Sequence, residues 1–301
     1  MRLLAPAKIN LHLRVGSPRA DGFHPLVSWM CTVGLFDILS IDRSRGRGVV
    51  LSCDMPGLAC DASNLIVKAA TALANSLAEC EAPAAASDRG LSVMLQKRIP
   101  LGAGLGGGSS DGARVLQGLN RLWTARWSRE KLAALSASLG SDLPFFFYEP
   151  SAVCRGRGEL VQPISPPQPR FALLILPDLH MPTAAVYRCF DQMHLGTREA
   201  IEQEPDWQHW TQLSAATLLP LLVNDLEPAA FAIDPRLGRL RADVEQILGR
   251  IVRMSGSGSS LFSLFDTQPE AADAAQQVAQ RLAVKALAVE LAPPVADDTG
   301  T

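Results

Sequence analysis

The sequence predicts an α+β fold with two layered domains, and three observations lead to this prediction. An alternating stretch near the start, KINLHLRV, precedes a D-G turn and a long apolar stretch, which is typical of antiparallel strands joined by a hairpin. Helix and strand patterns then follow in a mixed order, without the regular alternation of a parallel α/β protein. The proline-rich segment VQPISPPQPR, at 161–170, marks a boundary between two halves.

We place an N-terminal domain at 1–165, a C-terminal domain at 166–292 and a flexible tail at 293–301. The 301 residues suffice for two modest domains. Hydrophobic residues make up 48% of the chain and charged residues 19%, so a sizeable core can form in each half.

The elements of the first half follow from local pattern. Residues 8–15 alternate, which predicts a strand with one buried face and one polar face. Residues 26–41 and 91–99 are apolar runs that predict further strands, and 79–90 predicts a surface loop. Helices are predicted over three segments, with Ser63 as the N-cap of the first and Gly140 near the end of the third: 63–78, 109–123 and 128–140.

The second half contains three strand patterns and three helix patterns. Strands are predicted at 171–176, 260–265 and 284–291. Helices are predicted at 183–190, 235–250 and 269–283.

Composition limits the class of protein. Lys and Arg total 28 against 30 Asp and Glu, which argues against nucleic acid as a partner because no basic excess exists to neutralise phosphates. No segment has the pattern of a signal peptide or a membrane span, so we expect a cytoplasmic protein. We also expect a monomer or weak homodimer. The six cysteines show no metal-binding spacing and are expected to be reduced thiols: Cys31, Cys53, Cys60, Cys80, Cys154 and Cys189.

The segment IPLGAGLGGGSSDGA, at 99–113, carries the strongest functional signal. A strand, a glycine-rich loop and a helix start bring several backbone N–H groups and a helix dipole to one point, which forms a cradle for phosphate. Ser109 and Ser110 add hydroxyl groups. The alternative is an elaborate helix cap, with one of these serines as N-cap and Asp111 complementing the dipole.

Other phosphate-binding motifs fit the segment less well. Gly102, Gly104 and Gly107 satisfy the G-x-G-x-x-G pattern of dinucleotide-binding oxidoreductases. That motif requires a second strand ending in an acid about 20 residues further on, whereas 124–137 has the pattern of a helix. The lysine of a Walker A loop and the H-R-D and D-F-G motifs of protein kinases are missing from the sequence.

The glycine-rich segment resembles the phosphate loop of the GHMP small-molecule kinase superfamily. The segments APAKINLHLRV, RADGFHPL, SNLIVKA, LGSDLPFF, NDLE and SGSGSS follow in the order found in its branch that acts on cytidine-diphosphate methylerythritol, so the resemblance covers roughly residues 5–265. It implies ATP-dependent phosphorylation of the 2-hydroxyl of that substrate, in non-mevalonate isoprenoid precursor synthesis. Two alternatives stay open: a GHMP kinase of homoserine or mevalonate type, and a nucleotide-binding protein without catalysis.

The resemblance also assigns roles to individual residues. Asp142 matches the catalytic base and Lys8 the cation beside it, although Asp142 before a proline also fits a helix N-cap. Asn10, Phe23, His24, Thr183 and Tyr187 match substrate-binding positions, with Phe23 and Tyr187 stacking on the two faces of cytosine and His24 reading its edge. The ATP site comprises Asn64, Lys97 and the loop residues Pro100, Leu101, Gly102, Ala103, Gly104, Leu105, Gly106, Gly107, Gly108, Ser109 and Ser110.

Three further features concern the same site. Mg²⁺ is expected with ATP, and Ser110 is its candidate protein ligand. The flexible second glycine-rich loop at 255–260 matches a segment beside the phosphates. Gly112 stands where the family usually has alanine, and the glycine pair common after the catalytic aspartate is missing.

Overall fold

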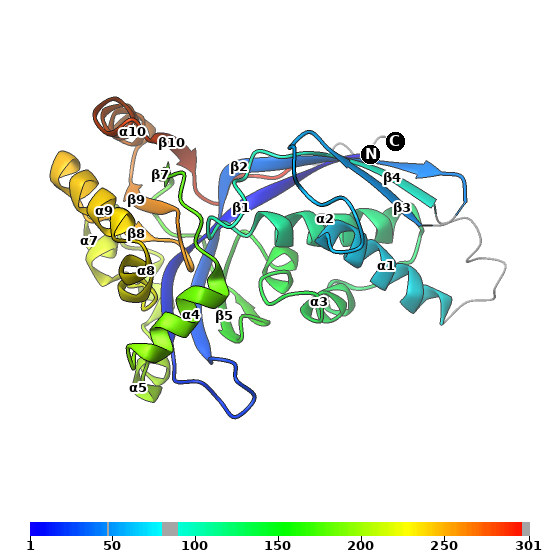
Figure 1. The fold of residues 1–301 in the computed structure, drawn as a ribbon, viewed down its shortest axis with the longest axis horizontal. Coiled ribbons are helices and arrows are strands. Elements are labelled where there is room, and N and C mark those ends of the chain that lie inside the picture. The colour runs from blue at the N-terminus through cyan, green and yellow to red at the C-terminus, as the bar shows by residue number, and fades with distance from the viewer. Residues whose placement is uncertain (47, 80–89, 297–301) are drawn as a thin grey trace.

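The structure is a computed structural model that describes residues 1–46, 48–79 and 90–296. Its first sheet has six strands in the order β3-β4-β2-β5-β6, with β1 paired along β2, and only β3 and β4 run parallel (Figure 1). The strands of this sheet are β1 Arg2–Val15, β2 Leu26–Ser44, β3 Val49–Cys53, β4 Gly90–Gln96, β5 Ser151–Gly156 and β6 Leu160–Pro163.

A second sheet is antiparallel, with the order β10-β7-β9-β8. Its strands are β7 Phe171–Leu176, β8 Arg253–Met254, β9 Leu261–Phe265 and β10 Lys285–Glu290. The two sheets and the mixed order of helices confirm the α+β prediction. The proline-rich segment at 161–170 joins the last strand of the first sheet to the first strand of the second. The division into domains at 165/166 itself stays a prediction, and so does the tail at 293–301, of which the structure describes only residues to 296.

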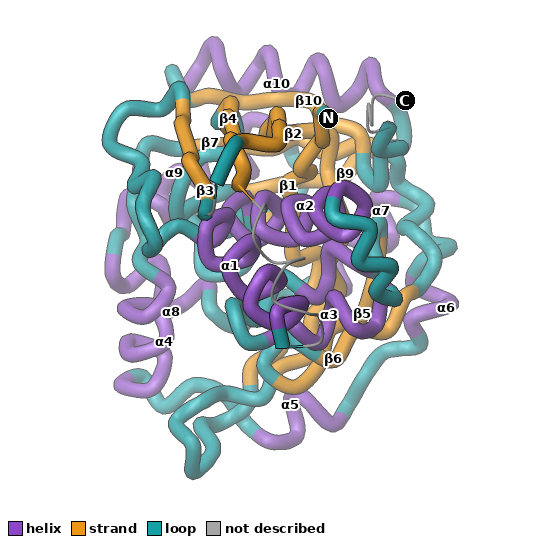
Figure 2. The backbone as a smooth tube through the Cα atoms, turned by 90° about the vertical axis from the view of Figure 1, so that its right-hand side faces the viewer, coloured by secondary structure: helices purple, strands orange, loops and turns teal. Residues whose placement is uncertain are grey.

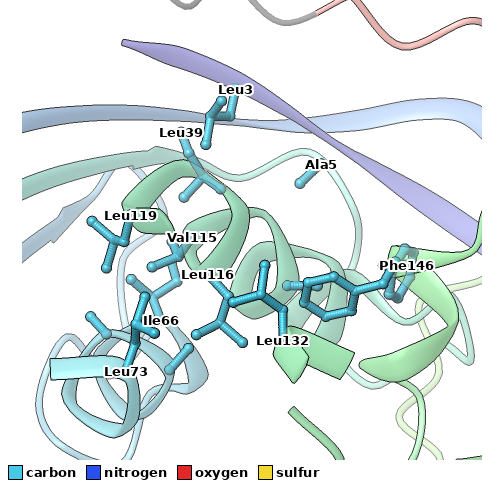
Figure 3. Close-up of a cluster of buried hydrophobic side chains, with 14 of the residues drawn as sticks. Leu3, Ala5, Leu39, Ile66, Leu73, Val115, Leu116, Leu119, Leu132 and Phe146 are labelled. Carbon is cyan, nitrogen blue, oxygen red and sulfur yellow. The ribbon is translucent and has the colours of Figure 1, made fainter. Parts of the chain in front are cut away.

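Three helices lie together on one side of the first sheet (Figure 2). They are α1 Leu65–Ala78, α2 Gly107–Leu122 and α3 Arg129–Ala137, and the short 3₁₀ helix η1 Pro144–Phe147 follows them. Figure 3 shows apolar side chains of α2 between those of the strands and those of α1. Val115, Leu116 and Leu119 are fully buried there, because their spacing puts them on one face of α2.

The second sheet packs against α4, α8, α9 and α10, which bury a separate apolar cluster. The helices of this half are α4 Thr183–Gln192, α5 Arg198–Glu202, α6 Trp207–Trp210, α7 Ala215–Leu218, η2 Leu219–Leu221, α8 Glu227–Ile233, α9 Pro235–Leu248 and α10 Gln268–Leu282. In this half each predicted strand and helix forms, with ends that differ from the prediction by at most two residues.

The prediction that β1 has one solvated face is wrong. Lys8, Asn10 and His12, which occupy the expected polar face, are each only 3% exposed. Ile9 and Leu11 are buried on the other side in a cluster shared with the second sheet. Both faces are covered because β1 runs through the whole molecule between its two halves, which local alternation of residue types cannot reveal.

Several predicted helix ends are also corrected. The N-cap of α1 is Asn64, whose side-chain oxygen accepts a hydrogen bond from the backbone N–H of Ile66 at 2.9 Å, and Ser63 lies one residue before it. Helix α3 ends at Ala137 with Ser138 as its C-cap, so Gly140 lies beyond the helix end. The predicted loop at 79–90 falls almost entirely on residues 80–89, which lie outside the described residues.

The structure also describes the state of the cysteines and the lengths of the helices. Cys31, Cys53, Cys60, Cys154 and Cys189 are free thiols, and Cys80 lies outside the described ranges. None of the helices in the described ranges has the length and apolar character that crossing a bilayer requires.

Candidate active site

A cleft of about 390 Å³ brings together most of the residues predicted to act. The glycine-rich loop and the first turn of α2 form one wall. Side chains from β1, from the segment before η1 and from α4 form the others. Among the predicted residues, the cleft is lined by Lys8, Asn10, Lys97, Asp142, Thr183, Tyr187 and the loop from Pro100 to Ser109.

The glycine loop is shaped by contacts with the protein itself. Gly104 and Gly106 have φ angles of +75° and +66°, which disfavour any other residue. A Cβ on Gly104 would overlap the carbonyl oxygen of Ser255, and a Cβ on Gly106 would lie 2.9 Å from Cε of Lys8. The glycines at these two positions therefore allow the second glycine-rich loop and Lys8 to approach the backbone, a role that the sequence did not indicate.

The N-terminus of α2 opens into the cleft without a side-chain cap. Its N-cap is Gly106, and no side chain accepts a hydrogen bond there, so the serine-cap alternative is wrong. Gly108 is exposed and Ser109 lines the cleft, whereas Ser110 is fully buried on the inner side of the helix. Because the first N–H groups of a helix lack intrahelical partners and the dipole is positive here, this point suits a phosphate group.

Lys8 and Asp142 form an ion pair at the centre of the cleft. Nζ of Lys8 lies 3.2 Å from Oδ2 of Asp142 and also donates hydrogen bonds to Oδ1 of Asn10 at 2.6 Å and to the carbonyl oxygen of Gly104 at 3.3 Å. The Lys8 side chain is 4% exposed, while the Asp142 side chain is 33% exposed. The carboxylate is therefore the accessible member of the pair, open to a ligand in the cleft.

Hydrogen bonds fix Asn10 beneath this pair. Its Nδ2 donates to Oγ of Ser28 at 2.8 Å, and its backbone N–H donates to Oγ of Ser255 at 3.1 Å. The Ser255 hydroxyl in turn donates to the carbonyl oxygen of Gly104 at 2.9 Å. Ser28 and Ser255 thus position the Lys8 partners, and the sequence signalled this role for neither residue.

Asp142 does not cap the helix that follows it. The N-cap of η1 is Leu143, and no side chain accepts a hydrogen bond there. The carboxylate instead faces Lys8 and approaches Tyr187: burial raises the pKa of Tyr187, and the negative charge of Asp142 adds to this effect. Tyr187 therefore stays a neutral phenol beside the carboxylate.

Lys97 is held between two carboxylates below the glycine loop. Its ammonium group is paired with Asp37 and lies 2.8 Å from Oδ2 of Asp111, and all three side chains are almost fully buried. Burial alone would lower the pKa of Lys97, but the two carboxylates raise it overall. Oδ1 of Asp37 also accepts hydrogen bonds from the backbone N–H groups of Arg98 and Ile99. The lysine predicted to contact adenosine is thus engaged in a buried ionic cluster.

The sequence offered one overlooked signal for this cluster. Asp37 is a lone acid within the apolar run of β2, and a buried acid requires a cationic partner. Burial raises the pKa of Asp111, and its Oδ1 is buried without a hydrogen-bond partner among the described residues.

Asn64, the other predicted adenosine contact, caps α1 and does not line the cleft, although the adjacent Leu65 does.

The residues predicted to hold cytosine are only partly assembled. The rings of His24 and Tyr187 lie 5.1 Å apart and tilted. His24 has a partner at each ring nitrogen, because Nδ1 lies 2.9 Å from the carbonyl oxygen of Gly16 and Nε2 lies 3.3 Å from Oδ1 of Asp191. Phe23 is half-exposed outside the cleft lining, and the Arg157 guanidinium lies over its ring at 4.7 Å.

The second glycine-rich loop is not the flexible segment that we expected. Ser255, Ser259 and Ser260 are almost completely buried. The backbone N–H of Ser260 donates to the carbonyl oxygen of Ala103 at 3.1 Å, and the hydroxyl groups of Ser257 and Thr183 lie 2.9 Å apart. The loop is thus packed along the first glycine loop, and it connects that loop to α4.

The chain is similar to known proteins over most of its length. Residues 64–149 match the model of the GHMP kinases N terminal domain, and residues 200–284 match that of the GHMP kinases C terminal. The 4-diphosphocytidyl-2-C-methyl-D-erythritol kinase of Synechococcus sp. strain CC9902 is 37% identical over 293 residues, which cover 94% of this chain and 93% of the relative. The protein of that name from Synechococcus sp. strain CC9605 is 40% identical over 291 residues, with 92% of each chain covered.

Solved structures agree with these matches. A crystal structure of 4-(cytidine 5'-diphospho)-2C-methyl-D-erythritol kinase is similar at a TM-score of 0.75 and 35% identity, covering 98% of this chain and 100% of the other. A homoserine kinase from Cytophaga hutchinsonii has a TM-score of 0.70 at 17% identity, covering 98% and 95%. The second likeness concerns the fold alone.

We predict that Lys97→Met destabilises the fold instead of weakening ATP binding alone. Removal of the ammonium group would leave the Asp37 and Asp111 carboxylates buried without their cation, which costs about 3–5 kcal/mol. Arg98→Met is the matched control, because it removes the same charge from the exposed next residue. Urea unfolding of both variants measures the difference. If Lys97→Met unfolds like the wild type and has only a raised KM for ATP, then the lysine contacts the nucleotide and the structural role is excluded.

Proposed function

The chain belongs to the 4-diphosphocytidyl-2-C-methyl-D-erythritol kinases of the GHMP kinase family, and from this premise we propose that it transfers the γ-phosphoryl group of ATP to the 2-hydroxyl of 4-diphosphocytidyl-2-C-methyl-D-erythritol. It is an ATP-dependent small-molecule kinase, as its relatives are named. The reaction is a step of non-mevalonate isoprenoid precursor synthesis.

The observation that carries this proposal is the Lys8–Asp142 pair beside the glycine loop. Phosphoryl transfer needs aligned reactants, a group that receives the hydroxyl proton and positive charge near the oxygens that gain negative charge. Asp142 is the partly accessible carboxylate that accepts the proton of the acceptor hydroxyl. The buried ammonium of Lys8, 3.2 Å away, places a positive charge where it stabilises the developing alkoxide.

The triphosphate of ATP binds at the glycine loop and the uncapped N-terminus of α2. The exposed Gly108 and the hydroxyl of Ser109 face the bound phosphates. The loop is held by Ser255 on one side and by the Lys97 cluster on the other, so its N–H groups are oriented before ATP arrives.

Mg²⁺ enters with ATP. The described part of the chain contains no group of three or more His, Cys, Asp or Glu side chains placed to hold a metal ion. This fits Mg²⁺, which keeps several waters and binds mainly through the phosphates and one or two protein oxygens. The protein oxygen in the cleft that would hold such an ion is the hydroxyl of Ser109, whereas the hydroxyl of Ser110, the candidate from the sequence, is buried on the inner side of α2 and does not line the cleft. The ion would neutralise phosphate charge.

The cytidine end of the acceptor binds at Tyr187. The Tyr187 ring lines the cleft together with Lys8 and Asp142, so a base stacked on it lies beside the reacting groups. Phe23, on the flanking loop, covers the other face of the base, and His24 presents its ring edge once the base replaces one of its present partners.

An acceptor panel tests the proposed function. ADP release is measured with 4-diphosphocytidyl-2-C-methyl-D-erythritol, homoserine, mevalonate and galactose at equal concentrations. We expect turnover with the cytidine substrate at a kcat/KM at least about a thousandfold above the others, because a site built for polar groups rejects ligands that lack them. Faster turnover of homoserine or mevalonate would assign the chain to another branch. ATP binding without turnover of any acceptor would favour a non-catalytic nucleotide-binding protein.

We predict that Asp142→Asn lowers kcat by about 10²–10⁴, because the amide cannot accept the proton of the acceptor hydroxyl. The Kd for ATP should change little, whereas the thermal stability should fall modestly, because the neutral amide leaves the buried Lys8 ammonium without its carboxylate. Lys8→Met should also lower kcat, and it should destabilise the protein as well, because it leaves Asn10 and Gly104 without their donor. A normal kcat in Asp142→Asn would remove this residue from the chemistry.

We predict that Tyr187→Ala and Phe23→Ala each raise KM for the cytidine substrate by about one to two powers of ten, because aromatic stacking contributes about 1–3 kcal/mol per base. KM for ATP should stay constant. Tyr148→Ala is the control, since it removes the chain's other tyrosine, which packs against the first core and does not line the cleft. If Phe23→Ala leaves KM unchanged while Tyr187→Ala raises it, the base stacks on one face only.

A further inference from the structure

A second cavity, of about 690 Å³, lies on the opposite side of β1 from the cleft and shares no lining residue with it. Leu13 faces the cleft, and its neighbour Arg14 faces this cavity, as the alternation of side chains along a strand requires. The other walls come from 195–200, 223–228, α9 and β8. The cavity includes none of the residues that we place in phosphoryl transfer.

The charged groups around this cavity are unevenly paired. Three guanidinium groups line it, those of Arg14, Arg241 and Arg253, against the carboxylates of Asp225 and Glu227. Arg14 is paired with Asp225 at 2.9 Å, and Arg241 is paired with Glu227 at 2.9 Å. Arg253 has no ion pair with any residue that the structure describes, and its buried Nε has no hydrogen-bond partner among them. Glu245, outside the cavity lining, contacts Arg241 at 3.3 Å and makes no ion pair with Arg253, so Arg253 is the guanidinium of the three without a direct counter-ion among the described residues.

An unpaired guanidinium in this position costs folding free energy. Burial lowers the pKa of Arg253, and although Glu227 opposes this effect, the positive charge of Arg241 adds to it. Buried charges in proteins are otherwise paired or hydrogen-bonded, because the loss of water is not compensated without a partner. A ligand that places a negative oxygen against the part of this guanidinium that lines the cavity would provide a partner.

The rest of the cavity wall is largely apolar, with Phe190, Leu195, Pro228 and Phe231 among its residues. We propose that the cavity binds a small organic anion, in which one carboxylate or phosphate group pairs with Arg253 and an apolar body packs against Phe190 and Phe231. The planar fork of a guanidinium suits both head groups, and the volume lies in the range of small-molecule sites. The proposal does not depend on the phosphoryl-transfer activity.

Calorimetric titration of the full chain tests this site. The probes are hexyl phosphate and hexanoate, with 1-hexanol as the neutral counterpart, at constant ionic strength and with saturating ADP so that the glycine loop is occupied. We expect saturable binding of at least one anion, tighter than that of 1-hexanol, and the tighter anion identifies the head group. Arg253→Gln should weaken that binding about ten- to a hundredfold, which corresponds to the loss of charge-assisted hydrogen bonds.

Two further variants make the result specific. Arg239→Gln removes the same charge from the exposed surface of α9 and should bind the probe like the wild type. Arg253→Lys keeps the charge and should recover part of the affinity. Thermal unfolding is measured first, and we expect Arg253→Gln to be at least as stable as the wild type because it loses an unpaired charge. Equal binding by wild type and Arg253→Gln, equal affinity for 1-hexanol, or no saturable binding of either anion would each overturn the proposal.

Discussion

The ammonium group of Lys8 is the point on which the geometry of the cleft depends. It contacts the side chain of Asn10 on β1, the carbonyl oxygen of Gly104 in the glycine loop and the carboxylate of Asp142 before η1. Because the group is almost excluded from water, these three partners must satisfy its charge together. The loop proposed to hold the nucleotide and the carboxylate proposed to accept the proton are thus fixed relative to each other by one cation.

The glycine loop is constrained from two sides, although its sequence is typical of a flexible segment. Lys97, Asp37 and Asp111 form a buried ionic cluster under the start of α2. On the other side, Ser255 donates a hydrogen bond to the Gly104 carbonyl. Glycine residues allow neighbouring groups to approach the backbone closely, and here the resulting contacts hold the loop in place. Preorganised N–H groups need little rearrangement when an anion binds.

Strand β1 explains how two halves of the chain produce one cleft. Its first residues, such as Leu3, pack with the helices over the first sheet, while Leu13 and Val15 belong to the core of the second half. Register shifts between Pro6 and Ala7 and after Asn10 turn its side chains between these surroundings. The strand therefore carries Lys8 in its middle, where groups from both halves can reach it.

Local residue patterns were enough to predict most of the elements, and they indicated a phosphate-binding role for the loop. Strand β7 coincides with its predicted range, and the glycine pattern together with its flanking segments was enough to indicate the kinase family. The partners of these side chains depend on the tertiary structure: Lys97 meets Asp37 from 60 residues away, Asn64 caps α1 and does not line the cleft, and Arg253 has no described counter-ion. Periodicity reports only which face of one element is apolar, whereas burial of both faces of β1 and the pairing of charges depend on which distant segments pack together.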